Sequence, residues 1–129
     1  YEDKVNKLII VTGKGLHSDN EKNPYVSKDL GILKHSIPEF VKTHSEPCAF
    51  VHIDCDLYSS TVDILENLSN QIVPGTVILF DELTGYNAWK IHEYKAFMEF
   101  VKKYDVEYEW IAFVANAGQA ACKITRRGK

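Results

Sequence analysis

The chain has 129 residues, of which 45% are hydrophobic and 26% are charged, and this composition fits one compact domain with a core of its own. Fifteen Lys and Arg against eighteen Asp and Glu give a formal net charge of -3, which excludes the basic composition typical of proteins that bind nucleic-acid phosphates. No stretch approaches the roughly 18 consecutive apolar residues that a membrane-spanning helix needs. We therefore expect a single domain over residues 1–129 that does not insert into a membrane, and nucleic-acid binding becomes a minority hypothesis.

The cysteines predict free thiols. Cys48, Cys55 and Cys122 are an odd number without a C-x-x-C spacing, and each lies in an apolar run where a small reduced side chain packs well. The chain also opens without the charged and apolar segments of a secretory signal. These features predict a reducing, cytoplasmic environment.

The first predicted strand covers residues 7–11, an apolar and β-branched run that stops at Thr12-Gly13-Lys14-Gly15. A glycine-rich turn after a strand is typical of phosphate- and nucleotide-binding loops, because glycine lets backbone N–H groups approach a ligand closely. The alternative is that the two glycines only form a turn. Residues 17–29 are polar and have no periodicity, which predicts a long exposed loop.

A helix is predicted over residues 30–44, where Pro38 marks either its start or a kink. The apolar residues that share its inward face are Leu33, Ile37, Phe40 and Val41. The residues expected to face water are Lys34, Glu39, Lys42 and His44. The strand before this helix should pair in parallel with the strand after it.

Two further buried strands are predicted to end on acids. Residues 49–54 end on Asp54, and residues 76–80 run into Asp81 and Glu82. Between these strands, Ser60 and Asp63 have the spacing of a capping box at the start of a helix. The residues that this helix should bury are Val62, Leu65, Leu68 and Ile72. A strand, a helix and a strand in this order predict a parallel pair.

The last third of the sequence is predicted to form a helix and a hairpin. The helix runs from Trp89 or Lys90 to Lys103, and the residues expected to face inward are Ile91, Tyr94, Phe97 and Val101. Residues 109–114 and 119–124 flank Asn116-Ala117-Gly118, which has the chemistry of a hairpin turn.

The predicted order is therefore β-α-β-α-β-α-β-β. It indicates a three-layer Rossmann-like α/β sandwich, with helices on both faces of a mostly parallel sheet of about five strands and an antiparallel hairpin at the C-terminus. Ligands of such folds bind at the carboxyl ends of the strands.

The strongest chemical signal is the set of acids at that edge, Asp54, Asp56, Asp81 and Glu82. Several carboxylates close together repel one another, so that they take up protons or recruit a cation, and oxygen ligands suit Mg²⁺, Ca²⁺ or Mn²⁺. The alternative is that Asp56 and Glu82 only cap helices or face water.

Other candidate residues lie near the same edge. His92, at a helix start, is a candidate catalytic residue over the cleft, whereas His52 on a buried strand is interpreted as a core histidine. Tyr58, Tyr86 and Trp89 could form the wall of a cofactor or substrate site, or cover the core.

Three runs carry a family resemblance. Residues 50–61 (FVHIDCDLYSST), 73–82 (VPGTVILFDE) and 92–97 (HEYKAF) closely resemble the macrocin O-methyltransferase (TylF-type) family, and the resemblance covers about residues 46–125. It implies a class I S-adenosylmethionine-dependent fold that uses Mg²⁺ to methylate sugar hydroxyls.

The resemblance also implies roles for individual residues. Asp54, Asp81 and Glu82 match the metal-binding acids, with Glu82 where better-known members have Asp, and Asp54 lies near the reacting hydroxyl. Asp54 and His92 are thus the candidate catalytic residues. The candidate cofactor-binding residues are Thr12, Gly13, Gly15, Asp56 and Tyr58.

In such folds S-adenosylmethionine is held by a glycine-rich turn after the first strand and by an acid on the second, both upstream of the matched segment. We therefore expect weak binding of this cofactor and a truncated or recombined methyltransferase that acts, where active, on a small sugar-type substrate.

The N-terminal segment resembles another family. Residues 10–18 (IVTGKGLHS), 23–25 and 33–40 are similar to the second half of a small MutS-related (Smr) domain, a nucleic-acid-binding or nicking module, over about residues 5–44. The two resemblances meet near residues 38–47, which indicates a natural or engineered chimera. Three functions follow as hypotheses: a methyltransferase-like domain, a chimeric fold without catalytic function, or an Smr-type nucleic-acid binder.

Overall fold

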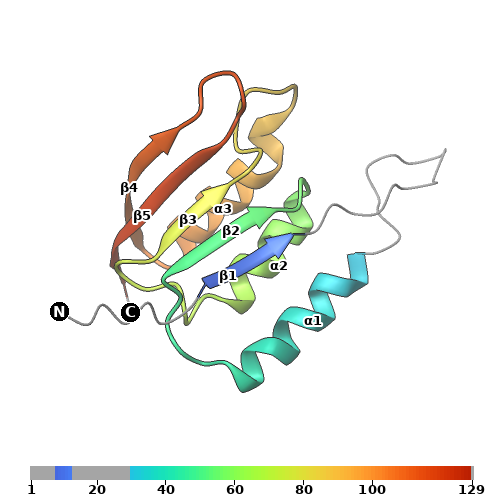
Figure 1. Cartoon of the computed structure of the whole chain (residues 1–129), viewed down its shortest axis with the longest axis vertical. Coiled ribbons are helices and arrows are strands. Elements are labelled where there is room, and N and C mark those ends of the chain that lie inside the picture. The colour runs from blue at the N-terminus through green and yellow to red at the C-terminus, as the bar shows by residue number, and fades with distance from the viewer. Residues whose placement is uncertain (1–7, 13–29, 129) are drawn as a thin grey trace.

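A computed structural model of the chain describes residues 8–12 and 30–128, with side chains from residue 36 onward. Figure 1 shows the described elements in chain order. They are β1 (Leu8–Thr12), α1 (Leu30–Thr43), β2 (Phe50–Asp54), α2 (Tyr58–Asn67), β3 (Val77–Phe80), a 3-10 helix η1 (Trp89–Ile91), α3 (Glu93–Lys103), β4 (Val106–Phe113) and β5 (Ala120–Arg127). The predicted order of strands and α-helices is confirmed. None of the helices in these ranges is long and apolar enough to cross a membrane.

The strands form one sheet in the order β1-β2-β3-β5-β4. β1 pairs with β2 and β2 with β3 in parallel, whereas β5 is antiparallel to both β3 and β4. The predicted parallel pairing of the first two strands and the C-terminal hairpin are confirmed. The prediction of a mostly parallel sheet is corrected to a mixed sheet, because the hairpin returns β5 into the position between β3 and β4.

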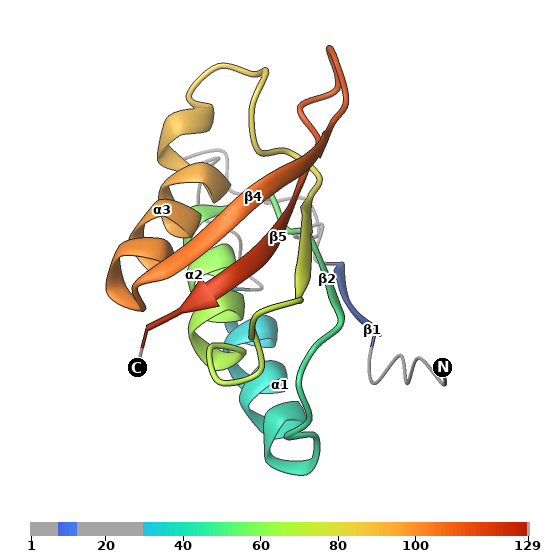
Figure 2. The same cartoon turned by 90° about the vertical axis from the view of Figure 1, so that its left-hand side faces the viewer.

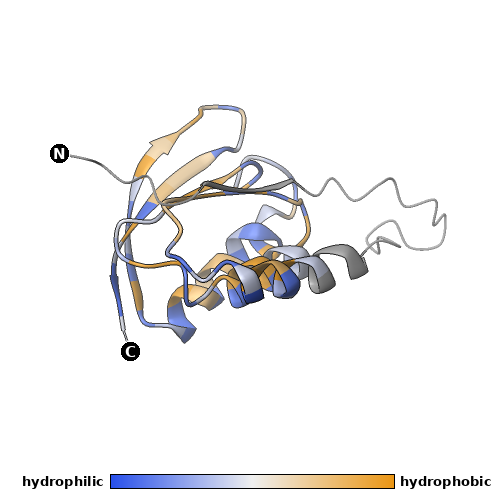
Figure 3. Ribbon diagram, turned by 60° about the horizontal axis from the view of Figure 1, so that its bottom comes forward, coloured by the Kyte–Doolittle hydropathy of each residue, from blue (hydrophilic) through white to orange (hydrophobic). Residues whose placement is uncertain are grey.

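The helices cover one face of the sheet. In Figure 3 all three α-helices lie below the strands, and α2 lies between α1 and α3 (Figure 2). The predicted three-layer arrangement is therefore wrong for the described residues. Its physical reason is the strand order: β1, β2, β3 and β4 follow one another in a single direction across the sheet, so that right-handed crossovers all fall on the same face.

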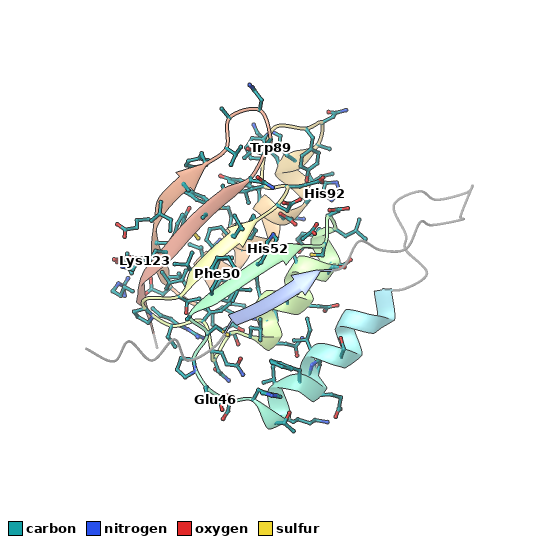
Figure 4. All side chains as sticks on the ribbon, in the orientation of Figure 1. Glu46, Phe50, His52, Trp89, His92 and Lys123 are labelled. Atoms are coloured by element: carbon teal, nitrogen blue, oxygen red, sulfur yellow. The ribbon has the colours of Figure 1, made fainter. Side chains whose placement is uncertain are left out.

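The core lies between the sheet and this helical layer. Alternation along β2 and β3 buries Val51, Ile53, Ile78 and Phe80. Phe97 of α3 packs against Phe80 with ring centroids 5.0 Å apart. The remaining large side chains that are fully buried include Phe100, Ile64, Leu65, Leu68, Ile72 and Ile124. The opposite face, which carries His52 and Lys123, is turned toward the viewer in Figure 4.

Helix α1 contacts α2, and its contact stripe toward the core includes Ile37 and Val41. Ile37 is buried and Val41 packs against the core, but Phe40 is 36% exposed and stacks on His44 with centroids 4.2 Å apart. The predicted burial of Phe40 is therefore wrong, because its position falls beside the contact stripe. Glu39, Lys42 and His44 are exposed as predicted, while the side chains of Leu33 and Lys34 lie outside the described residues.

Two predicted helix starts are corrected. Helix α2 begins at Tyr58, with Leu57 as its N-cap and no side-chain cap, so that Ser60 is a buried residue of the first turn instead of a cap. Before α3 the backbone of His92 (φ -108°, ψ -124°) interrupts the helical path. Ile91 is consequently 58% exposed instead of facing inward.

Candidate functional site

The carboxyl ends of β2 and β3 bring two predicted acids together. Ile53 is in register with Phe80, and the N–H of Asp81 donates to the carbonyl of Ile53 at 2.9 Å. Asp54 and Asp81 thus follow these paired residues on adjacent strands, which lie about 4.8 Å apart in any sheet. Since Ile53 and Phe80 face the helices, the alternation places the next residue, Asp54, on the opposite face.

The polar residues continue across the edge on both sides. Thr12, the last residue of β1, is in register with Asp54. On the other side, Gln119 directly before β5 donates from Nε2 to Oδ1 of Asp81 at 2.6 Å. Sequence reasoning missed Gln119, because its contact with Asp81 depends on the antiparallel return of β5. The edge therefore carries a row of polar residues from four adjacent strands.

A buried glutamate at the start of α3 belongs to the same region. The side chain of Glu93 is fully buried, and its Oε2 accepts a hydrogen bond from the N–H of Glu82 at 3.4 Å. Burial raises the pKa of Glu93 to about 7, with the charges of Asp56 and Glu82 adding to the rise, while hydrogen bonds from the backbone of Glu82 and Cys55 oppose it. Sequence analysis singled out His92 for its place at a helix start and missed its neighbour Glu93, because glutamate is normally an exposed residue.

Asp56 and Glu82 lie within electrostatic reach of this glutamate. Asp56, two residues after the end of β2, has a left-handed backbone (φ 58°), which turns the chain toward α2. Tyr86 shares their environment: burial raises the pKa of its phenol to about 12, followed by the charges of Glu93, Glu82 and Asp56. The loops after β2 and β3 and the start of α3 therefore form one electronegative region.

His92 joins this region through its contact with Tyr86, whose ring centroid lies 6.1 Å from that of the histidine. Figure 4 places His92 near the carboxyl ends of the central strands, beyond His52. Within the described part of the chain, several buried side-chain atoms have no hydrogen-bond partner: His52 Nε2, Asp54 Oδ1, Tyr86 OH, His92 Nδ1 and Glu93 Oε1. All except the first belong to this edge. Because buried polar atoms are normally paired, this concentration is typical of a site for a polar ligand.

The predicted aromatic wall lies partly elsewhere. Tyr58 donates from its hydroxyl to Oε2 of Glu99 at 2.6 Å and has Lys95 over its ring, 4.5 Å from the centroid. It thus joins α2 to α3. Trp89 packs edge-on against Tyr94, with centroids 4.9 Å apart. Gly13 and Gly15 of the predicted cofactor turn lie outside the described residues.

Two of the three predicted metal ligands are brought together by the structure. Asp54 and Asp81 are neighbours, but residues 8–12 and 30–128 contain no group of three or more His, Cys, Asp or Glu that could hold a metal ion. The cysteines add no ligand or nucleophile, since all three are buried free thiols. Burial raises the pKa of both Cys55 and Cys122 to about 12, so that these thiols stay protonated at neutral pH.

Comparison with protein families gives one match. Residues 22–111 match the family model described as macrocin-O-methyltransferase (TylF). This match begins upstream of residue 46, where the resemblance read from the sequence begins, and it includes α1, which had been assigned to an Smr-type segment. The Smr resemblance and the chimeric origin stay predictions. A search of the curated proteins finds no match.

Two solved structures are similar in fold. The apo structure of CalS11, a TDP-rhamnose 3'-O-methyltransferase of calicheamicin biosynthesis, superposes with a TM-score of 0.57 at 20% identity and covers 72% of this chain and 38% of its own. A second CalS11 structure, a calicheamicin methyltransferase, gives a TM-score of 0.55 at 20% identity, with 72% and 35% covered. The chain thus spans less than two fifths of the length of these structures.

Proposed function

The chain belongs to the macrocin-O-methyltransferase (TylF) family, whose model matches residues 22–111, and from this premise we propose that it is a methyltransferase-like domain acting on a sugar-type hydroxyl. S-adenosylmethionine is the proposed methyl donor, and when bound it supplies a sulfonium methyl group to the attacking oxygen. The observation that carries the proposal is the pair Asp54 and Asp81 at the carboxyl edge, where one carboxylate oxygen of Asp54 is buried without a partner.

Asp54 is the proposed general base. Methylation of a hydroxyl forms an oxygen–carbon bond and breaks the carbon–sulfur bond of the donor, and the hydroxyl proton must leave with a base. Oδ1 of Asp54 can accept that proton because no other described group hydrogen-bonds to it. The neighbouring Asp81 is already held by Gln119, so that its carboxylate can accept a hydrogen bond from the acceptor hydroxyl and orient it without changing its own position.

His92 has the proposed role of holding the acceptor. Its Nδ1 is buried without a partner among the described residues, and its ring contacts Tyr86. Either nitrogen of a neutral imidazole can bond a sugar hydroxyl, one as donor and the other as acceptor. His92 and Tyr86 therefore offer polar atoms on the α3 side of the edge.

The proposed cofactor position is the turn after Thr12. Since Thr12, the last residue of β1, is in register with Asp54, β1 ends at the same edge as the acids, which is where open α/β sheets bind nucleotides. Gly13, Gly15 and Asp56 stay the proposed cofactor residues, while the hydroxyl of Tyr58 already bonds Glu99. Because the chain covers only 38% of the first CalS11 structure, we expect weak cofactor binding by this segment alone.

Metal assistance, which the resemblance implies, is not part of the proposed mechanism. Asp54 and Asp81 are the two adjacent carboxylates that would hold a Mg²⁺ ion, and, because residues 8–12 and 30–128 contain no cluster of three or more such ligands, water and substrate oxygens would complete its shell. Every step above is assigned to protein groups.

The proposed acceptor is a neutral sugar ring, as in a nucleotide-linked deoxyhexose. CalS11 is described as a TDP-rhamnose methyltransferase, which makes TDP-rhamnose a suitable probe. The carboxylates of Asp54 and Asp81 repel a diphosphate, so that only the sugar end of such a molecule can approach the edge.

Chemical-shift mapping by NMR tests this proposal and tolerates weak binding. S-adenosylhomocysteine and TDP-rhamnose, each at millimolar concentration, should shift the amide signals of residues 54–56, 81–82 and 92–93. Asp54→Asn should reduce the shifts caused by the sugar nucleotide. The matched control Glu109→Gln, at an exposed position of β4, should leave them unchanged.

Other results would favour the alternatives. Shifts confined to the amino ends of the strands, or none with either ligand, would contradict the proposal and favour a chimeric fold without catalytic function. Binding of RNA or DNA that falls steeply with salt would favour the Smr-type hypothesis.

A further inference from the structure

Glu93 occupies an unusual position for a glutamate at the start of a helix. It is the first residue of α3, yet its side chain is fully buried, with the charges of Asp56 and Glu82 nearby. Burial of a carboxyl group close to other carboxylates is costly. An apolar side chain of similar size would fill the same space without this cost, so that packing alone does not explain a glutamate here.

The contacts of the Glu93 side chain join two loops. Its Oε2 accepts a hydrogen bond from the N–H of Glu82 at 3.4 Å, and the backbone of Cys55 lies close enough to the carboxylate to oppose the rise of its pKa. Glu82 directly follows Asp81 in the loop after β3, and Cys55 directly follows Asp54 after β2. One carboxylate from α3 thus bonds the residue after Asp81 and lies beside the residue after Asp54.

We propose that Glu93 is a positioning residue, whose side chain holds the loops after β2 and β3 together and thereby fixes Asp54 and Asp81 relative to the acceptor hydroxyl. The catalytic consequence rests on the proposed function, whereas the linking of the two loops does not. Glu93 itself does not touch the substrate in this scheme, because its side chain is closed off from solvent.

The rest of the sheet does not supply this link. Parallel pairing fixes the backbone of β2 and β3 up to Ile53 and Phe80, and one further ladder bond reaches Asp81. Beyond that point each chain leaves the sheet, and the left-handed backbone of Asp56 turns the first loop away toward α2. A side chain from a third element is then needed to keep the two departing loops in a fixed relation.

Amide hydrogen exchange followed by NMR tests the link directly, in the full chain and without any ligand. Glu93→Gln keeps an acceptor oxygen and almost the same shape, whereas Glu93→Met keeps the volume and removes the acceptor. In the Met variant the N–H of Glu82 should exchange about ten-fold faster or more, relative to the N–H of Leu79 in the same strand, since a bond to a charged group is lost. In the Gln variant the ratio should stay within about three-fold of wild type.

A matched control is Glu99→Gln, which removes a charge from an exposed position of the same helix and should leave the ratio unchanged. An unchanged Glu82 amide in Glu93→Met would overturn the proposal, and so would equal acceleration of Glu82 and Leu79, which indicates a general loss of stability. If Glu93→Met does not fold, Glu93→Gln provides the test. Faster exchange of the Glu82 N–H in the Gln variant would contradict a link through an acceptor oxygen.

A second measurement addresses the catalytic consequence. With S-adenosylmethionine and TDP-rhamnose as probes, Glu93→Met should lower kcat at least ten-fold with KM within about two-fold, and Glu93→Gln should restore most of kcat. A rise in KM at constant kcat would contradict positioning of the acids. If the wild-type chain transfers no methyl group, the proposed function fails, while the exchange measurement still decides whether Glu93 links the loops.

Discussion

The two edges of the sheet differ in whether their buried polar groups are hydrogen-bonded. At the amino edge, Thr76 donates from Oγ1 to the carbonyl of Cys48 at 2.6 Å and accepts from the N–H of Val73 at 3.0 Å, while the side chain of Gln71 donates to the carbonyl of His44. At the carboxyl edge, polar atoms of Asp54, Tyr86, His92 and Glu93 are buried without partners among the described residues.

This difference separates stability from function within a single small domain. The paired polar groups at the amino edge fix where the strands begin, and their hydrogen bonds are already used within the protein. Unpaired groups at the carboxyl edge reduce stability, but those of Asp54, Tyr86 and His92 are available to a polar substrate. The buried carboxyl of Glu93, whose pKa is raised, also reduces stability and has the proposed role of positioning the loops. Substitutions at the two edges should therefore have opposite effects on the free energy of unfolding.

The largest expected effect concerns pH and Glu93. Its pKa is about 7 in the folded protein against an ordinary value of 4.5, so that between these values the folded state binds the extra proton. The contribution of Glu93 to the free energy of unfolding is therefore most favourable below about pH 4.5. It falls by about 3 kcal/mol in total as the pH rises to about 7. Urea unfolding at pH 5 and pH 8 measures this change.

Glu93→Gln provides the control for that titration, because the amide cannot ionise. The variant should lose the part of the pH dependence assigned to Glu93 and should be more stable than wild type at pH 8. Parallel pH profiles of the variant and wild type would show that Glu93 does not titrate in this range.

The next largest effect is expected at the amino edge. Thr76→Val keeps the shape of a fully buried side chain and removes the hydroxyl that bonds Cys48 and Val73. The free energy of unfolding should fall by about 1–3 kcal/mol, because the buried carbonyl of Cys48 and the N–H of the half-buried Val73 lose the hydroxyl as a partner. The control Thr125→Val, at an exposed position of β5, should change it by less than about 0.5 kcal/mol. A similar loss in both variants would contradict the role given to the hydroxyl.

A smaller effect is expected where α1 meets the amino edge. Phe40 is 36% exposed and stacks on His44, whose carbonyl accepts from Gln71. Phe40→Ala should therefore cost about 1 kcal/mol, well below the 3–5 kcal/mol of a fully buried phenylalanine. Lys42→Ala should change little, since its pair with Glu39 is exposed. A loss above 3 kcal/mol for Phe40→Ala in urea melts would show that Phe40 packs more tightly than described.

The sequence predicted those features that depend on local pattern. Apolar runs that end on Asp54 and Asp81 established two parallel strands and their common edge, and the Asn116–Gly118 turn established the hairpin. The layer arrangement depends on which strands become neighbours, and no local pattern specifies that order. Three layers were predicted, and the described helices lie on one face.

The same limit applies to the site. Asp54 and Asp81 were found because each ends its own strand. Gln119 and Glu93 were missed because they reach the edge only after β5 and α3 have folded back onto it. Burial of a glutamate also contradicts the usual preference of this residue for the surface, so that its sequence position alone predicts the opposite of what the structure has.

The smallest expected effect on stability is at Asp54. Its sign tests most directly whether the two edges differ in their contribution to stability. Oδ1 of Asp54 bonds no described group, and Asp81 follows the adjacent strand with the same charge, so that like charges across neighbouring strands repel by a few tenths of a kcal/mol to about 1 kcal/mol. Asp54→Asn should therefore raise the free energy of unfolding by about 0.5 kcal/mol, while Asp63→Asn on α2 serves as the control for loss of a carboxylate. Urea melts at low and high salt measure both, and the gain should shrink at high salt because screening already weakens the repulsion. A loss of stability in Asp54→Asn comparable to that of Thr76→Val would mean that Asp54 stabilises the fold, as the paired groups of the amino edge do. The proposed difference between the two edges, with stability lower at the carboxyl edge in favour of ligand binding, would then be wrong.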